Sequence, residues 1–163
     1  MKHYTAALNP NLLFVHINLA EAYTNPSIPM YEDAIKLLDT VHKNIPQKHR
    51  RLLNETFRLQ GYIKSKMFRQ QAIELYNEAI KYNPNDFESL IEYGNLLLDS
   101  DSKKCLQLYQ SAEEVLKQRG EQPQPELYNN LAVMAIATQS YKLACSYIQQ
   151  AFDQLEVWCA TTR

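Results

Sequence analysis

Glycine is scarce in this chain, which has only 3 among its 163 residues. Hairpin turns and phosphate-binding loops depend on glycine, so few of either are expected. The 3 cysteines are odd in number and form no CxxC pair, which disfavours a disulfide framework and favours an intracellular, reducing compartment. No apolar run reaches the roughly 18 residues of a membrane span. The net charge of −1 argues against nucleic-acid or membrane-surface binding as the main task.

Catalytic and metal-binding motifs are missing as well. The sequence contains no GxxxxGK[ST], HExxH or GxSxG. Its 4 histidines have no cysteine or carboxylate neighbours at metal-binding spacing. We therefore expect no enzyme activity, no cofactor and no metal. His16 falls at a helix-packing position and is expected to be structural, with a ligand role as the alternative. Cys105 and Cys145 lie in or beside a stripe of small residues and are expected to be buried packing groups rather than nucleophiles.

A helical repeat is what the sequence does contain. Four segments share a small residue, a bulky residue four positions later, and a small or β-branched residue three positions after that. This spacing puts the three side chains on one helical face. The triplets are Ala34/Leu38/Val41, Ala72/Tyr76/Ala79, Cys105/Tyr109/Ala112 and Ala144/Ile148/Ala151. Pro46 and Pro84 each follow the first small residue of a triplet at the same offset and end two of the helices.

A second amphipathic helix precedes each of these. In the last repeat the two helices together place Tyr128, Leu131, Ala132, Ala135, Tyr141 and Ala144. This pattern resembles the W-x2-L-G-x2-Y…A signature of the tetratricopeptide repeat (TPR), with tyrosine for tryptophan and alanine for glycine. Leu90, Tyr93, Gly94 and Leu97 occupy the same frame in the third repeat. In the second repeat Leu52, Leu53, Phe57, Gln60 and Gly61 belong on the first helix but fit no clean frame.

The sequence therefore predicts an all-α, right-handed TPR superhelix of about four helix-turn-helix repeats plus a partial N-terminal helix. We expect a single solenoid over 1–163, forming part of a longer array. Its parts are the tail of a preceding helix at 1–10 and repeats at 13–46, 48–84, 87–118 and 125–158. Apolar Phe152, Leu155, Val157 and Trp158 are expected to leave an exposed stripe on the last helix.

In a TPR superhelix the first helix of each pair faces the concave side. The residues expected there form a candidate peptide-binding groove, in which side-chain amides suit an extended backbone. They are Asn18, Glu21, Arg58, Glu92, Asn95, Asn129 and Asn130. A solvated surface without a ligand is the alternative. Some TPR co-chaperones clamp a C-terminal carboxylate with basic and amide side chains. Here the equivalent positions carry Ile17, Glu21, Arg58, Glu88 and Glu92, whose acidic members would repel it.

One dense basic cluster, Lys48-His49-Arg50-Arg51, follows Pro46. It is expected to be a solvated first turn, with a nuclear-import or nucleic-acid patch as the alternative. The tyrosines fall mostly at packing positions, so we expect them in the core rather than in a base-stacking surface.

The stretch Asp86–Ala132 carries a closer resemblance. It is similar to the family of large TPR scaffold subunits of the RNA polymerase II-associated factor (PAF) complex. The matching elements are Ile91-Glu92-Tyr93-Gly94, Asp101, Cys105/Tyr109/Ala112, Pro125-Glu126 and Asn129-Asn130. Leu90 and Cys105 depart from the family, which has an aromatic residue and alanine there.

The resemblance implies a non-catalytic scaffold in transcription elongation, located in the nucleus and binding other proteins rather than nucleic acid. A cytosolic adaptor of the trafficking or chaperone type, binding a peptide in its groove, is the alternative. A structural spacer that makes its contacts through exposed solenoid ends, including a homodimer formed through those ends, is the third reading.

Overall fold

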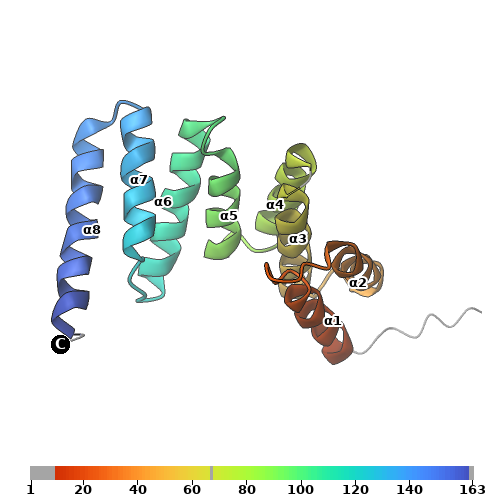
Figure 1. The fold of residues 1–163 in the computed structure, drawn as a ribbon. Helices are drawn as coiled ribbons and strands as arrows, with labels where there is room; N and C mark the ends of the chain where they lie inside the picture. The colour runs from red at the N-terminus through yellow and green to blue at the C-terminus, as the bar shows by residue number, and fades with distance from the viewer. Residues whose placement is uncertain (1–9, 67, 162–163) are drawn as a thin grey trace, which may run out of the picture. The chain divides into compact units, whose positions relative to one another are not determined.

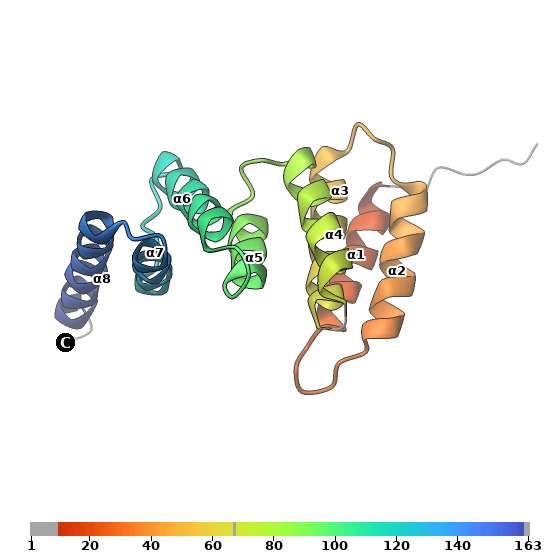
Figure 2. The same ribbon diagram turned by 90° about the horizontal axis from the view of Figure 1, so that it is seen from above.

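The computed structural model describes residues 10–66 and 68–161, and every regular element in these ranges is an α-helix. The all-α fold predicted from the sequence is therefore confirmed. Contacts between Cα atoms divide the chain into two compact units, Met1–Pro84 and Asn85–Arg163. Four described helices belong to each unit (Figures 1 and 2). The single solenoid and its repeat boundaries stay predictions.

The first unit consists of two helix pairs. Helix α1 packs against α2 and α3 against α4, while α3 also contacts both α1 and α2. The aromatic ring of Phe57 lies between the rings of His42 and Tyr82, at centroid distances of 5.0 and 5.6 Å. The helices are α1 (Pro10–Ala22), α2 (Tyr31–Asn44), α3 (Arg50–Ser65) and α4 (Arg69–Tyr82).

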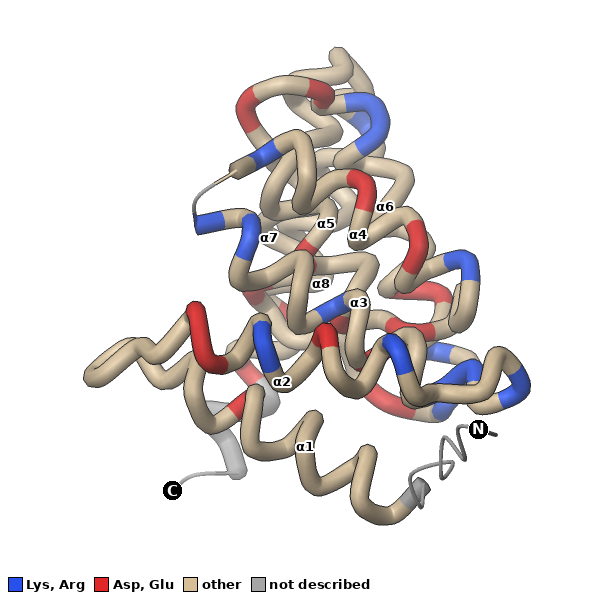
Figure 3. The backbone as a smooth tube through the Cα atoms, turned by 90° about the vertical axis from the view of Figure 1, so that its right-hand side faces the viewer, with Lys and Arg blue, Asp and Glu red and all other residues tan. Residues whose placement is uncertain are grey.

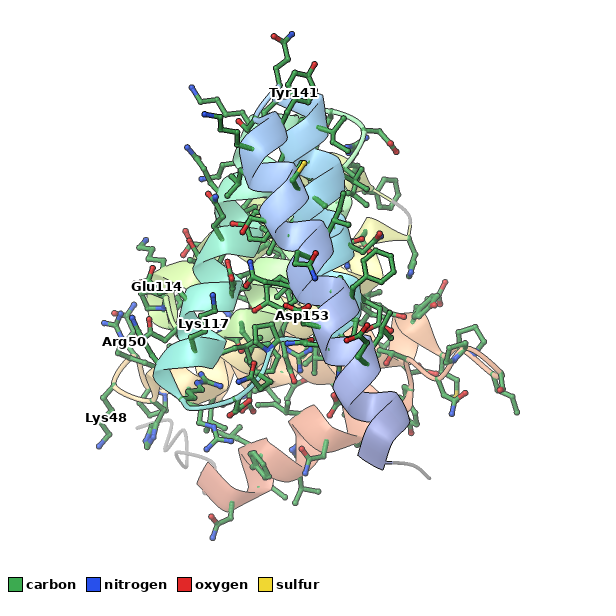
Figure 4. All side chains as sticks on the ribbon, turned by 90° about the vertical axis from the view of Figure 1, so that its left-hand side faces the viewer. Lys48, Arg50, Glu114, Lys117, Tyr141 and Asp153 are labelled. Atoms are coloured by element: carbon green, nitrogen blue, oxygen red, sulfur yellow. The ribbon has the colours of Figure 1, made fainter. Side chains whose placement is uncertain are left out.

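The basic cluster at the start of α3 has a structural role through one of its members. Arg50 donates from Nε to the Tyr82 carbonyl at 3.1 Å and from Nη2 to the Lys81 carbonyl at 2.9 Å. These carbonyls end α4, where a cation also complements the helix dipole. Arg51 pairs with Glu55 at 3.0 Å, and Lys48 is exposed (Figure 4). The cluster is thus a first turn, as expected, with Arg50 holding a neighbouring helix end.

The second unit also consists of two helix pairs. Helix α5 packs against α6 and α7 against α8, and α6 also contacts α7. Asp86 and Asp101 begin α5 and α6 as N-caps, accepting hydrogen bonds from the backbone N–H groups of Ser89 and Lys104. The helices are α5 (Phe87–Leu97), α6 (Ser102–Gln118), α7 (Pro125–Ala137) and α8 (Tyr141–Thr161).

In both units a glycine on a first helix lies against a tyrosine ring on the second. A Cβ atom at Gly61 would lie 3.1 Å from Cε1 of Tyr76, and one at Gly94 would lie 2.6 Å from Cε1 of Tyr109. Tyr76 and Tyr109 are buried to 1% and 0% exposure. The second repeat, which fitted no clean frame in the sequence, therefore has the same helix crossing as the third.

The two crossings differ in how much room they leave, which predicts different effects of Gly→Ala. Alanine favours a helix interior over glycine by about 1 kcal/mol, whereas overpacking costs about 1–3 kcal/mol. We expect Gly94→Ala to lower the free energy of unfolding by about 1–2 kcal/mol, and Gly61→Ala to change it little. Urea denaturation followed by circular dichroism measures both. Equal effects of the two substitutions would contradict this account of the crossing.

Two helices end in a Schellman motif, in which the chain turns through a left-handed residue. At the end of α6 the N–H groups of Gly120 and Glu121 donate to the carbonyls of Lys117 and Leu116. At the end of α7 those of Gln139 and Ser140 donate to Ile136 and Ala135. The left-handed residues are Gly120, with φ of 72°, and Gln139, with φ of 59°.

Of the two left-handed positions, only the one at the end of α6 is occupied by glycine, the residue that adopts this conformation without strain. A left-handed conformation costs a side-chain-bearing residue about 1–2 kcal/mol. We expect Gln139→Gly to raise the free energy of unfolding by about 1 kcal/mol and Gly120→Ala to lower it by about the same. Thermal melts of the two variants and the parent test this pair. A destabilising Gln139→Gly would show that the Gln139 side chain contributes more than the turn geometry costs.

Some apolar side chains are more exposed than the repeat pattern predicts. Helix α1 has Glu21 as its one charged residue and is drawn tan along most of its length (Figure 3). Four of its large side chains are exposed: Leu12, Phe14, Val15 and Leu19. On α8, Ile148 is 40% exposed and Tyr147 is buried instead, so the fourth triplet does not pack as predicted. Among the described residues, no helix packs against these faces of α1 and α8.

Other expectations for the chain ends and cysteines have mixed outcomes. Phe152 and Leu155 are exposed as predicted, while the side chains of Val157 and Trp158 lie outside the described residues. The helix tail expected at 1–10 also lies outside them, except for Pro10, where α1 begins. Cys105 is buried as expected, but Cys145 is exposed because it faces away from the α7 contact.

Candidate functional site

A groove between α5 and α7 is the best candidate for a binding site in the second unit. No Cα atom of α5 lies within 8 Å of one of α7, whereas α1 and α3 of the first unit approach that closely. The space between them has a volume of about 380 Å³. We call it the α5–α7 groove. It is lined by Phe87, Ile91, Asn95, Leu116, Glu121, Gln122, Gln124, Glu126, Leu127 and Asn130.

The rim of the groove is built by the long connection between α6 and α7. The Schellman turn at Gly120 directs the chain away from α6, and Pro123 is fully buried further along. Arg119 donates to the Asn85 carbonyl, and its guanidinium lies 5.4 Å from the centre of the Phe87 ring. These contacts tie the connection to the start of α5. The connection is therefore a structured wall that carries Glu121, Gln122 and Gln124 into the groove.

Asn95 is oriented from the core of the helix pair. The Tyr109 hydroxyl donates to Asn95 Oδ1 at 2.6 Å, and the Cys105 thiol donates to the Gly94 carbonyl at 3.2 Å. Because Asn95 Oδ1 accepts the hydrogen bond from the Tyr109 hydroxyl, the amide N–H groups of Asn95 remain to face a ligand. Burial raises the pKa of the Tyr109 hydroxyl above its usual range, so it remains a donor at neutral pH. Burial also raises the pKa of the Cys105 thiol, which favours its neutral form.

On the opposite side of α6 lies a second hollow with its own charged group. Glu113 is buried and pairs with Lys117, whose ammonium lies 6.0 Å from the centre of the Tyr128 ring. The hydrogen bond that Lys117 donates to Glu113 raises the pKa of Lys117. Tyr128 stacks on Tyr147 at 6.2 Å, and the Tyr147 hydroxyl accepts a hydrogen bond from Gln110. The Lys117 and Glu114 side chains are visible on α6 in Figure 4.

The predicted groove residues fall in two places. In the first unit Arg58 and Glu21 lie 3.7 Å apart as an ion pair, while Asn18 is exposed on α1. In the second unit Asn95 and Asn130 line the α5–α7 groove. Asn129 is exposed and does not line it, and Glu92 is half-buried. Their role in peptide binding stays a prediction.

Sequence reasoning missed most of the groove lining. Glu121, Gln122 and Gln124 belong to a connection whose extra length was visible in the sequence. The length of the connection alone did not indicate that it would pack against the start of α5. Ile17, which stands at a clamp position in some TPR proteins, is 2% exposed and unavailable to a ligand. His16 donates a hydrogen bond from Nδ1 to the Leu12 carbonyl at 2.8 Å, in line with the structural role expected for it.

Within the described residues, no group of three or more His, Cys, Asp or Glu side chains could hold a metal ion. None of the described helices is long and apolar enough to span a membrane.

The comparisons with known proteins agree with the helical-repeat fold. The chain is 28% identical to the RNA polymerase-associated protein CTR9 of Caenorhabditis elegans, over 92% of this chain and 13% of that protein. It is 22% identical to the CTR9 homolog of Arabidopsis thaliana, over 60% of this chain and 9% of that protein. The chain thus spans a small part of the length of these relatives. No protein-family model matches it.

Solved structures resemble most of the chain. A crystal structure of MamA has a TM-score of 0.70 at 17% identity, covering 93% of this chain and 83% of MamA. MamA from Desulfovibrio magneticus RS-1 has a TM-score of 0.66 at 15% identity, covering 86% and 74%. MamA is a TPR protein. The fold is therefore of the TPR type. Most of this chain resembles a small part of CTR9 in sequence.

The raised pKa values of the buried tyrosines predict how stability depends on alkaline pH. Burial raises the pKa of Tyr109, Tyr128 and Tyr147, so the folded chain keeps these protons at pH values where the unfolded chain loses them. Their contribution to stability is complete below the ordinary tyrosine pKa of 10.0 and is lost as the pH rises above it.

We expect the free energy of unfolding to fall above pH ~10, and to fall less steeply in Tyr109→Phe. Denaturant titrations between pH 8 and pH 12 measure both slopes. The matched control is Tyr141→Phe, because Tyr141 is 62% exposed and should leave the slope unchanged. Identical slopes in the parent and Tyr109→Phe would contradict the prediction.

Proposed function

We propose that this chain is a non-catalytic protein-interaction segment of a CTR9-like scaffold, and that its α5–α7 groove binds an extended segment of a partner protein. The sequence similarity to CTR9 over 92% of the chain supports the scaffold role. Because CTR9 is an RNA polymerase-associated protein, the proposal extends to a nuclear partner in transcription elongation, within the PAF complex. The wider role rests on this similarity, and the binding site rests on the geometry of the second unit.

The observation that carries the site is the orientation of Asn95 at the groove. An extended peptide exposes carbonyl and N–H groups along its length, which amide side chains can pair with in both directions. Asn95 and Asn130 come from the two helices that face each other across the groove, and Gln122 and Gln124 come from its rim. The Tyr109 hydroxyl holds Asn95 in one orientation, which lowers the entropy that binding would cost.

A second candidate function is favoured by the exposed apolar face of α8. Tyr141, Ile148, Phe152 and Leu155 are all exposed and, with Cys145, recur at alternating spacings of four and three residues. This is the pattern of a helix that packs lengthwise against another. The pattern favours a structural spacer that contacts other proteins through this face of α8. Binding that survives changes in the groove but is lost with Phe152→Asp would distinguish it from the groove proposal.

We expect the double substitution Asn95→Ala and Asn130→Ala to weaken partner binding about thirtyfold, because each of the two lost amide hydrogen bonds costs on the order of 1 kcal/mol. The chain is prepared with a photo-crosslinking amino acid at Gln124 and irradiated in nuclear extract, and adducts are identified by mass spectrometry. CTR9-associated or polymerase-associated proteins should be crosslinked, and less so with the double variant.

The matched control is Asn129→Ala, which removes a neighbouring exposed amide that does not line the groove. It should leave the crosslinked partner unchanged. Undiminished crosslinking in the double variant would remove the groove from the function. Crosslinking to chaperone or trafficking proteins alone would instead favour the cytosolic adaptor.

A further inference from the structure

The α5–α7 groove carries charge of one sign. Helices α5 and α7 contain Glu88, Glu92 and Glu126 and no lysine or arginine. Of these, Glu126 lines the groove, where Glu121 is the other acidic residue and no described lining side chain is basic. Arg119, the one cation of the neighbouring connection, is engaged with the Asn85 carbonyl and the Phe87 ring. No basic side chain among the described lining residues therefore neutralises the negative charge of the groove.

The acidic character belongs to this groove rather than to first helices in general. In the first unit, α3 carries Arg50, Arg51, Arg58 and Lys64 against Glu55 alone. Helix α1 carries one charged residue, Glu21, which pairs with Arg58. The chain as a whole has a formal net charge of −1. The lining of the α5–α7 groove thus carries two carboxylates, Glu121 and Glu126, with no basic residue among its described side chains.

The groove also has an apolar floor. Leu116 and Leu127 are buried, and Phe87 and Ile91 are half-buried beside them. This combination offers a place for one aliphatic side chain with carboxylates at its edge. An acidic or phosphorylated segment would be repelled there, and so would nucleic acid.

We propose that the α5–α7 groove selects a basic extended peptide, with an aliphatic residue seated on Leu116 and Leu127 and a flanking lysine or arginine paired with Glu121 or Glu126. This inference rests on the proposed function and names the chemistry of the partner segment. Successive side chains of an extended chain point to opposite sides, so the basic residue stands two positions from the aliphatic one. The backbone between them lies within reach of Asn95 and Asn130.

Glu121 is the more informative of the two carboxylates. It follows the end of α6, where its N–H completes the Schellman turn and where the helix dipole disfavours a negative charge. Among the described residues it has no ion-pair partner. The fold therefore gains nothing from this carboxylate. Glu126 lies in the first turn of α7, where the dipole favours it, so that residue also serves its own helix.

The test uses an array of nonapeptides with a central leucine and all other positions drawn from serine, lysine and glutamate. The labelled full chain is applied, and the strongest binders are measured by fluorescence anisotropy at two salt concentrations. We expect lysine two positions from the leucine in the binders, and affinity that falls with salt. Glu121→Gln should weaken binding roughly threefold to tenfold while leaving the free energy of unfolding unchanged or higher.

Glu114→Gln is the matched control, because Glu114 is exposed on α6 and lines the opposite hollow (Figure 4). It should leave affinity unchanged. Binders without lysine, or a Glu121→Gln affinity equal to that of the parent, would overturn the charge selection while peptide binding itself stood. Failure of the whole array to bind would overturn the groove as a peptide site, and the charge selection with it.

Discussion

The close approach of a glycine backbone to a tyrosine ring is the contact on which the second unit depends. Gly94 has no Cβ atom, so the Tyr109 ring lies directly against α5. At that depth the tyrosine hydroxyl reaches through the helix pair to Asn95, on the groove side. One side chain therefore links the packing of the helix pair to the orientation of a residue that lines the candidate groove. A bulkier residue at position 94 would displace both the helix crossing and the amide that faces the groove.

The connection between α6 and α7 forms one side of the groove. The segment from Arg119 to Pro125 is longer than a tight turn, and its burial at Pro123 shows that it packs as part of the unit. Glu121, Gln122 and Gln124 of this segment form the rim of the groove. Loops of this kind, carried on a rigid scaffold, commonly hold binding residues.

The similarity to CTR9 and the geometry of the groove support different parts of the functional proposal. The first points to a scaffold associated with RNA polymerase, and covers only 13% of the CTR9 chain. The geometry of the groove points to the kind of ligand that this segment would bind. Amides for a peptide backbone, an apolar floor and carboxylates at the edge describe one kind of ligand, a basic strand-like segment of another protein. The exposed face of α8 differs from the groove in being apolar.

Much of the fold was open to prediction because helical periodicity is a local property. The recurring small, large and small residues placed the helices, and the scarcity of glycine excluded most alternatives. The glycine at position 61 was visible too, fifteen residues before Tyr76 as Gly94 is before Tyr109, although its frame was not recognised. Of the candidate site, the sequence identified Asn95 and Asn130. It also placed Ile148 in a packing position that Tyr147 occupies instead.

The sequence by itself thus determined that the chain forms paired amphipathic helices of the TPR type, since spacing along the chain decides which side chains share a face. Only the tertiary structure decided which of the outward residues border a common hollow. Glu121 and Asn95 lie far apart along the chain, and both line one groove because the α6–α7 connection packs back toward the start of α5. Such proximity depends on how a loop closes, which no periodic pattern encodes.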